Sequence, residues 1–271
     1  MLAYLCVMSV DKEILSSSKN PRIKRLLVLQ EKSAERRKEN VFVIEGAKEL
    51  EMAIEAGFEV EECYVRKQHS EYVSASWSFP VILVEDALFR KLVYRENVSE
   101  LLAIVRQKKF TLKDVMPGEQ SLLLLMESVE KPGNLGAVLR TCDGVKADAL
   151  ILCDPATDIW NPNVVRSSVG TVFGVPTVVA EPGELRKWLQ ENKYHLYAAA
   201  LSDTALNLHT SQFEKRSAII FGTEAFGLSE FWLREADTVM MIPMLGKNDS
   251  LNVSVSAAVM AYEYRRQFPK C

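Results

Sequence analysis

The chain has 271 residues, more than most single domains, so we expect two domains. Hydrophobic residues make up 48% of it and charged residues 25%, which is typical of a globular protein. The net charge of -3 excludes a general electrostatic attraction to nucleic acid, so a polyanionic partner requires a local basic patch.

The five cysteines form no CxxC pair and only three histidines are present, so no zinc-ligand spacing appears and we expect no metal. We interpret the cysteines as reduced thiols of a cytoplasmic protein. The apolar start, residues 1–7, lacks the basic leader and cleavage site of a signal peptide, and nothing approaches the roughly 20 apolar residues of a membrane span. We expect Met8 to be the native start; an intact Met1 on protein from the native host would contradict this.

Residues 18–38 carry the strongest charge asymmetry, with eight basic residues against two acidic ones. Leu26 and Leu29 fall on one helical side among these charges, which predicts a basic amphipathic helix. Two interpretations stay open: a solvated helix face, or a surface that contacts RNA phosphates. The candidate RNA-binding residues are Lys19, Arg22, Lys24, Arg25, Arg36, Arg37 and Lys38.

Short apolar runs after this segment predict a small α/β domain over residues 1–106. We expect strands at residues 41–44, 60–65, 81–84 and 101–105, and a helix over 47–56. The stretch 107–120 breaks the pattern with Pro117 and Gly118 and is the predicted linker.

From Ser121 onward strand and helix patterns alternate, which predicts a second α/β domain over residues 121–271. The expected strands are 122–126, 149–153, 175–179, 195–199, 217–221 and 239–242, and the expected helices start at Asn134, near Pro162, at Glu184 and at Asn252. This alternation indicates a mostly parallel sheet with both faces covered. Ligands of such sheets bind at the carboxyl ends of the strands.

Three segments place Gly, Pro and small polar residues at such strand ends: residues 129–141, 219–229 and 242–258. In the first, Pro132-Gly133-Asn134 forms a tight turn, and Asn134 can cap the following helix and leave N–H groups for an anion. Arg140, nearly two helical turns later, suits either a bidentate phosphate contact or a salt bridge.

The second segment contains Gly222-Thr223-Glu224, a glycine that permits close backbone approach followed by a carboxylate acceptor. It lacks the GxGxxG spacing, which disfavours a nucleotide dehydrogenase or a Rossmann-type methyltransferase. In the third segment, Ser250-Leu251-Asn252 precedes the last helix and either caps it or directs side chains into a pocket.

Together these segments resemble the three signature motifs of the SpoU (TrmH-type) RNA 2'-O-ribose methyltransferases, a branch of the SPOUT superfamily that uses S-adenosylmethionine. The resemblance covers residues 121–267. Residues 17–105 resemble the ribosomal-protein-L30e-like substrate-binding domain of the ribosomal RNA members, through Asn20-Pro21, the basic segment and the strand Phe42–Gly46.

The resemblance implies a deep trefoil knot in the parallel sheet and a homodimer whose site is completed across the interface. It implies that backbone groups of Gly222, Ile242 and Leu251 bind S-adenosylmethionine, with Thr223 and Asn252 close by. The residues implied at the reacting end are Asn134, Arg140, Glu224, Ser250 and Asn252.

The implied reaction is attack of a ribose 2'-oxygen on the sulfonium methyl group, so the protein must orient the hydroxyl and assist loss of its proton. The family's proposed activator is Arg140, but a guanidinium stays protonated and is a poor base. We therefore expect Arg140 to grip a neighbouring phosphate. Lys131 stands where many relatives carry Asn, and we expect it to affect RNA contact more than catalysis.

The leading function is methylation of 23S-type ribosomal RNA. A transfer RNA methylase is second, because those members generally lack an N-terminal domain of this length. A non-catalytic RNA-binding or ribosome-assembly factor is disfavoured because all five reacting-end residues are present. Antibiotic-resistance methylation stays open, and no motif encodes the target nucleotide.

Overall fold

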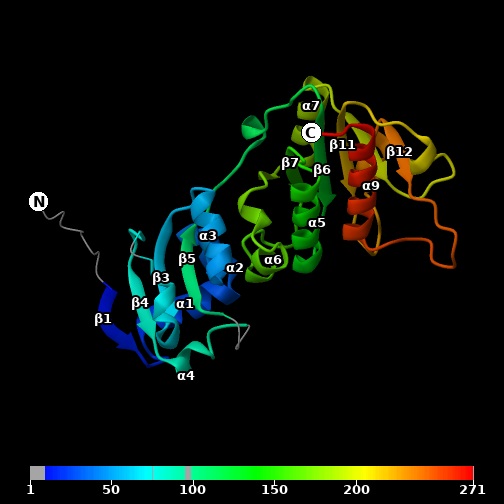
Figure 1. Ribbon diagram of the computed structural model, residues 1–271. Helices are drawn as coiled ribbons and strands as arrows, with labels where there is room; N and C mark the ends of the chain where they lie inside the picture. The colour runs from blue at the N-terminus through cyan, green and yellow to red at the C-terminus, as the bar shows by residue number, and fades with distance from the viewer. Residues whose placement is uncertain (1–9, 75, 95–98, 271) are drawn as a thin grey trace, which may run out of the picture. The chain divides into compact units, whose positions relative to one another are not determined.

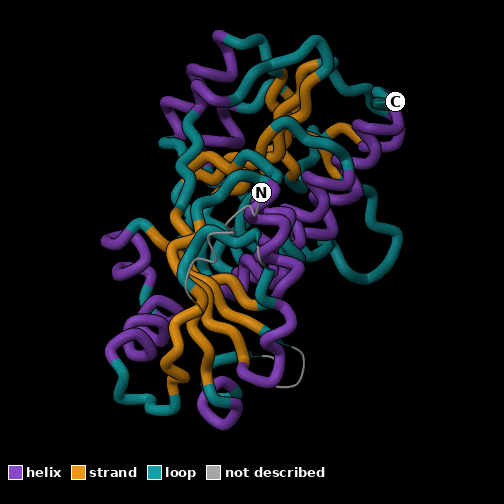
Figure 2. The backbone as a smooth tube through the Cα atoms, turned by 60° about the vertical axis from the view of Figure 1, so that its left-hand side comes forward, coloured by secondary structure: helices purple, strands orange, loops and turns teal. Residues whose placement is uncertain are grey.

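The computed structural model describes residues 10–74, 76–94 and 99–270, so Met1 and Met8 lie outside the described part. The chain forms two compact units. The first ends at Lys108 and also includes Trp160–Arg166; the second comprises Lys109–Ile159 and the chain from Ser167 onward. Each unit has its own sheet, whose strands lie side by side in Figure 2.

The first unit is built on a five-stranded mixed sheet of order β1-β4-β3-β5-β2. Its strands are β1 (Val10–Leu15), β2 (Val41–Glu45), β3 (Val60–Arg66), β4 (Val81–Val84) and β5 (Leu101–Arg106). Strand β5 runs antiparallel to both β2 and β3, while β4 is parallel to β1 and β3. Its helices are α1 (Pro21–Glu31), α2 (Ser33–Glu39), α3 (Ala47–Glu55) and α4 (Asp86–Phe89), with the 3-10 turn η1 (Lys67–Tyr72). Four predicted strands and the helix α3 are confirmed, whereas β1 and α4 were not predicted.

The prediction of one continuous basic helix is wrong, because the segment forms two helices. Asn20 caps α1 by accepting a hydrogen bond from the Arg22 amide, and Lys32 ends it in an extended conformation (φ -105°, ψ 107°). Leu26 and Leu29 of α1 are fully buried, as the amphipathic pattern predicts. Because α1 ends at Lys32, its helical periodicity does not continue into α2. The basic residue of α2 that faces the core therefore differs from the one that a single continuous helix would place there.

The second unit contains a seven-stranded sheet of order β10-β12-β9-β11-β6-β7-β8, in which every pairing is parallel. Its strands are β6 (Ser121–Glu127), β7 (Ala149–Cys153), β8 (Thr177–Val179), β9 (His195–Ala199), β10 (Leu206–Asn207), β11 (Arg216–Phe221) and β12 (Thr238–Met241). The predicted parallel α/β sheet is confirmed, and the two-residue strand β10 was not predicted.

Helices cover both faces of this sheet, which explains the nearly continuous apolar runs of its strands. They are α5 (Pro132–Gly144), α7 (Pro182–Glu191), α8 (Glu230–Glu235) and α9 (Val253–Gln267). The second unit also contains the 3-10 turns η2 (Leu112–Asp114), η3 (Thr171–Phe173) and η4 (Leu208–Thr210), whereas α6 (Pro162–Ser167) belongs to the first unit up to Arg166. Helices α5 and α9 pack side by side in Figure 1, on strands β6, β7 and β11. Helices α7 and α8 share a core cluster with alternate residues of the strands, such as Leu123 and Leu125, on the other face.

Part of the predicted linker, residues 107–120, packs into the second unit. Phe110 forms a bridge with Val178, and Leu112 and Val115 are buried in the core of the second unit. Conversely, the Trp160 ring stacks on Phe42 of the first unit at 4.3 Å between ring centroids. The compact units therefore do not follow the predicted boundaries at every residue.

No described helix is long and apolar enough to cross a membrane. Nor do the described residues contain a group of three or more His, Cys, Asp or Glu side chains placed to hold a metal ion.

Candidate active site

A pocket of about 680 Å³ lies at the carboxyl ends of β9, β11 and β12 in the second unit. These strands end at Ala199, Phe221 and Met241, and the loops that follow them supply most of the walls, together with the start of α9. The volume falls within the range of small-molecule sites, about 300–1,000 Å³. The position is where an open parallel sheet is expected to bind its ligand.

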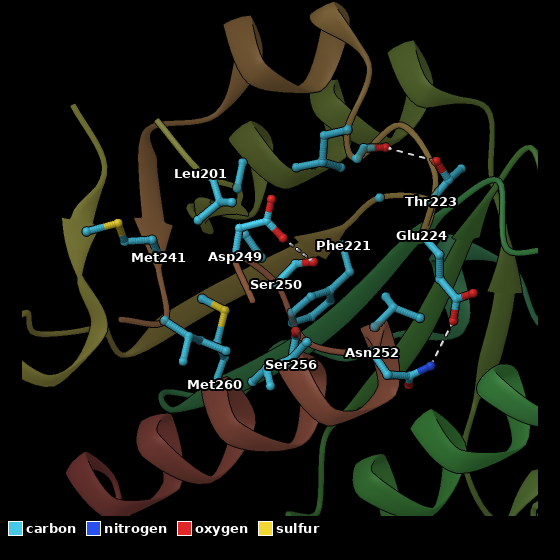
Figure 3. A pocket seen from close by; sticks show the side chains of 18 of the residues that line it. Leu201, Phe221, Thr223, Glu224, Met241, Asp249, Ser250, Asn252, Ser256 and Met260 are labelled. Atoms are coloured by element: carbon cyan, nitrogen blue, oxygen red, sulfur yellow. Dashed lines mark hydrogen bonds between the residues drawn. The ribbon is translucent and has the colours of Figure 1, made fainter. Parts of the chain in front are cut away.

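The pocket is lined by both apolar and polar side chains. Figure 3 shows Leu201, Met241 and the Asp249 carboxylate at one end, Glu224 and Asn252 at the other, and Ser250 between them.

Gly222 allows the loop after β11 to close tightly. A Cβ atom at this position would lie 2.1 Å from the carbonyl carbon and oxygen of Gly227, closer than real contacts allow. Two backbone hydrogen bonds close the turn: the Thr223 amide donates to the Gly227 carbonyl (2.9 Å) and the Gly227 amide to the Thr223 carbonyl (3.1 Å). Only glycine fits at position 222, and the turn presents Glu224 at the mouth of the pocket.

Glu224 joins three segments that are far apart in the sequence. Its carboxylate accepts hydrogen bonds from Asn134 in the first turn of α5 (2.5 Å) and from Asn252 before α9 (2.8 Å), and it pairs with Lys131. Asn252 also donates to the Asn134 side-chain oxygen (3.3 Å). One carboxylate thus receives three donors and fixes the relative positions of these segments.

These contacts hold the pKa of the Glu224 carboxyl below its usual value. The largest cause is the hydrogen bond from Lys131, followed by that from Asn134. A carboxylate with a lowered pKa and three donors is a weaker base than a free one. The arrangement therefore suits Glu224 to organise the site and not to accept a proton.

Asn252 serves both of the interpretations that the sequence left open. Its side-chain oxygen caps α9 by accepting from the Ser254 amide (3.0 Å), while its side-chain nitrogen donates to Glu224. The predicted capping role of Asn134 is wrong. Lys131 occupies the N-cap position of α5, and Asn134 lies inside the first turn, so its side chain is free to reach Glu224.

The structure brings together most of the residues predicted for the site. Those that line the pocket are Gly222, Thr223, Glu224, Ile242, Ser250, Leu251 and Asn252. Asn134 contacts the pocket through Glu224.

Arg140 does not line this pocket. It lies on α5 with its side chain exposed. No described residue of its own chain forms a hydrogen bond or an ion pair with the guanidinium.

The predicted RNA-binding surface on α1 and α2 needs correction. Arg36 is only 1% exposed, and its guanidinium donates to the backbone carbonyls of Leu29 (2.7 Å) and Gln30 (3.1 Å). Arg36 therefore joins α2 to the end of α1 and cannot contact RNA without leaving the core.

Arg25 also forms ion pairs within its own unit. Its guanidinium pairs with Glu39 (2.7 Å), Glu61 (2.7 Å) and Glu62 (3.2 Å), and this triple pairing offsets its charge. Five of the predicted basic residues keep exposed side chains: Lys19, Arg22, Lys24, Arg37 and Lys38.

Several residues of the site were not predicted from the sequence. Leu201, Phe226 and Asp249 line the pocket, and Glu127 at the end of β6 accepts a hydrogen bond from the Ser229 amide (2.8 Å) at the exit of the Gly222 loop. Position alone could have indicated Leu201 and Glu127, because each follows or ends a strand of the sheet. Asp249 lies in the irregular loop before α9, where no periodicity guides a prediction.

The fold and the pocket define an α/β protein with a pocket of small-molecule size at the carboxyl ends of parallel strands. Comparison with known proteins is more specific. Residues 121–262 match the SpoU rRNA Methylase family, and residues 20–103 match the MRM3-like substrate binding domain. The chain belongs to the SpoU rRNA methylase family, as its three motifs predicted.

Some relatives match nearly the whole chain, and others match about half of it. The chain is 28% identical over 251 residues to the 23S rRNA (guanosine(2553)-2'-O)-methyltransferase of Bacillus subtilis, covering 93% of this chain and 98% of that one. It is 35% identical to the tRNA (guanosine(18)-2'-O)-methyltransferase of Thermus thermophilus, over 55% of this chain and 76% of that one. The crystal structure of the AdoMet-bound rRNA methyltransferase from Sinorhizobium meliloti superposes with a TM-score of 0.87 at 26% identity, covering 95% and 99% of the two chains.

Proposed function

We propose that the protein methylates the 2'-oxygen of a ribose in ribosomal RNA of the 23S type, with S-adenosylmethionine as methyl donor. The observation that carries this proposal is the Glu224 network at one end of the pocket, because it unites the three motif segments at the place where a ligand fits. Ribosomal RNA is favoured over transfer RNA because the 23S relative matches both parts of the chain, whereas the transfer RNA relative matches about half of it. We place the reaction in the cytoplasm.

The residues present suit S-adenosylmethionine. Leu201 and Met241 offer an apolar surface for the adenine ring, and the loops at Gly222, Ile242 and Leu251 bring backbone groups to the walls. When bound, the cofactor supplies an electrophilic methyl group on a sulfonium sulfur. Thr223 would lie close to the cofactor, and Ser250 and Asn252 would line the reacting end.

The protein's part in the reaction is to orient the ribose hydroxyl and to assist the loss of its proton. Glu224 is a poor proton acceptor here, because its pKa is lowered and its oxygens already receive three donors. We assign it the positioning of Asn134 and Asn252 beside the ribose. Arg140 grips a neighbouring RNA phosphate bidentately, and solvent takes the proton as the methyl group is transferred.

A homodimer completes the site in this proposal. Arg140 is exposed and outside the pocket lining of its own chain, which supports a role in the site of a second copy. Val255 and Tyr262 of α9 are apolar side chains that are about half exposed, and α9 packs against the Arg140 helix, so this helix pair offers a surface for the second copy. We also propose, on the family resemblance, that the loops of the second and third motif segments, which follow β11 and β12, form a trefoil knot.

Methyl transfer from labelled S-adenosylmethionine to unmodified ribosomal and transfer RNA tests the function. After alkaline hydrolysis, a 2'-O-methylated position remains as an uncleaved linkage. We expect label at one resistant position of ribosomal RNA. Label in transfer RNA alone would favour the transfer RNA function. An absence of cofactor binding would instead favour a non-catalytic RNA-binding factor.

Mixing two inactive variants tests the shared site. In a random mixture of Arg140→Ala and Glu224→Gln chains, mixed dimers contain one site with both native residues, so about a quarter of wild-type activity should return. If both residues act within one chain, mixing restores nothing.

A further inference from the structure

Phe226 is an aromatic side chain that the fold leaves in solvent at the mouth of the pocket. It is 91% exposed, although it lines the pocket and lies two residues from Glu224. Within the described part of the chain it makes no ring contact with another aromatic residue. Exposed aromatic rings beside a polar site commonly serve recognition.

The turn that carries Phe226 is rigid. The Phe226 amide donates to the Thr223 hydroxyl (3.0 Å), and the two backbone hydrogen bonds between Thr223 and Gly227 close the turn. Leu228, on the exit side, is buried in the core of the second unit. Beyond it, the Ser229 amide is held by the Glu127 carboxylate. The exposure of Phe226 therefore arises from an anchored turn and not from a loose loop.

We propose that Phe226 stacks on the base of the nucleotide whose ribose is methylated. The proposal rests on the proposed function, which puts the ribose hydroxyl beside Glu224. Base and 2'-oxygen are carried by the same ribose, so a ring two residues from Glu224 lies within the reach of one nucleotide. A nucleotide presented to such a site is unstacked from its RNA neighbours, and an aromatic ring replaces the lost stacking without requiring a particular base.

Two other occupants would also cover the ring: the adenine of the cofactor and a second copy of the chain. The adenine is better served by Leu201 and Met241, which lie at the end of the pocket opposite Glu224. The dimer surface proposed above lies on α5 and α9, whereas Phe226 belongs to the loop between β11 and α8. The target base is the remaining partner that the position of Glu224 favours.

The test compares Phe226→Ala, Phe226→Leu and Phe226→Trp in steady-state methyl transfer to the RNA that the wild-type protein methylates. We expect kcat/KM for RNA to fall about tenfold in the alanine variant, and nearly as much in the leucine variant. The tryptophan variant should stay within about threefold of wild type, because a larger ring still stacks. Met116→Ala is the matched control, since Met116 is 82% exposed but does not line the pocket; it should leave kcat/KM unchanged.

An RNA that lacks the base at the mapped target position separates stacking from other effects. With this substrate, wild type and Phe226→Ala should have equal kcat/KM. A persistent tenfold difference would overturn the proposal, as would a leucine variant as active as wild type.

Two further measurements address the other occupants. Cofactor affinity, measured by calorimetry, and molar mass in solution should be unchanged in Phe226→Ala. A matching loss of cofactor affinity would assign the ring to the adenine, and a change in molar mass would assign it to the second copy. If the wild-type protein methylates RNA and the Phe226 variants behave like it, the stacking proposal fails alone; if the wild-type protein methylates no RNA, both proposals fail.

Discussion

The loops of the second unit and the basic helices of the first unit were both predicted to bind ligands, but their polar side chains differ in how far they are used within the fold. At the strand ends, Glu224, Asn134 and Asn252 direct their polar groups to one another at the mouth of a pocket. On α1 and α2, Arg25 and Arg36 are held by groups of their own unit. Motif residues at strand ends thus remain available to a ligand. In a run of charged residues, by contrast, some side chains are buried or paired within the fold.

The sharpest way to test the strand-end site is Arg140→Lys. Lysine keeps the charge but cannot form the bidentate contact, so we expect kcat to fall about 100-fold. The affinity for S-adenosylmethionine should not change, because Arg140 does not line the pocket. Single-turnover methyl transfer and calorimetry measure the two quantities. Near-native turnover would show that bidentate gripping is wrong.

Two adjacent arginines of α2, one buried and one exposed, test whether burial decides the role of a basic residue in this segment. Arg36→Ala removes a buried guanidinium that donates to two backbone carbonyls, and we expect a loss of about 2 kcal/mol in the free energy of unfolding. Arg37→Ala changes an exposed arginine beside it, so stability should change by less than about 0.5 kcal/mol. Urea unfolding measures both. Equal stability losses would mean that burial does not distinguish the two residues.

The exposed part of the basic segment should still bind RNA. Replacing Arg37 and Lys38 by Gln removes two phosphate contacts, so RNA affinity near 0.1 M salt should fall about tenfold, and the slope of log K against log salt should flatten by about 1.4. Lys187→Gln with Lys193→Gln makes the same charge change on and just after α7 and should have little effect. An unchanged salt slope in the α2 variant would remove this surface from the RNA interface.

A smaller effect is expected from Lys131→Met. The carboxylate of Glu224 has a lowered pKa, so in the wild-type protein it stays ionised as the pH falls below its usual range and is protonated only near the lowered value. Without Lys131 the pKa of Glu224 rises, and protonation then breaks the hydrogen bonds from Asn134 and Asn252 at a higher pH. The acid limb of the kcat/KM profile should move upward by less than about one pH unit, with a few-fold loss near pH 4. A superimposable profile would show that Lys131 does not control Glu224.

Much of the second unit was predictable, because its strands are buried on both faces and appear as apolar runs between turn residues. Strand β6 and helix α9 lie within one or two residues of their predicted bounds. Strand β10 and helix α8 were missed since they have two and six residues, too few to show a period. The charges at Asp11, Lys12 and Glu13 concealed β1.

The candidate site was predictable in its residues but not in its contacts. Gly222 and Glu224 could be singled out because a strand ends directly before them. The network between Glu224, Asn134 and Asn252 joins positions about 90 and 28 residues apart, and spacing alone does not show that they meet. The burial of Arg36 depends on the break at Lys32, where neither glycine nor proline marks the end of α1.

The central claim is that the loops at the carboxyl ends of β9, β11 and β12 hold S-adenosylmethionine, and calorimetric titration of two glycine variants tests it most directly. In Gly222→Ala the new methyl group meets the Gly227 backbone at 2.1 Å, so the turn must open. Gly174→Ala is the matched control in the same unit, because a Cβ there meets nothing within 4 Å. We predict at least about tenfold weaker cofactor binding in Gly222→Ala and wild-type binding in Gly174→Ala. Equal affinities in the two variants would contradict the claim that this pocket is the cofactor site.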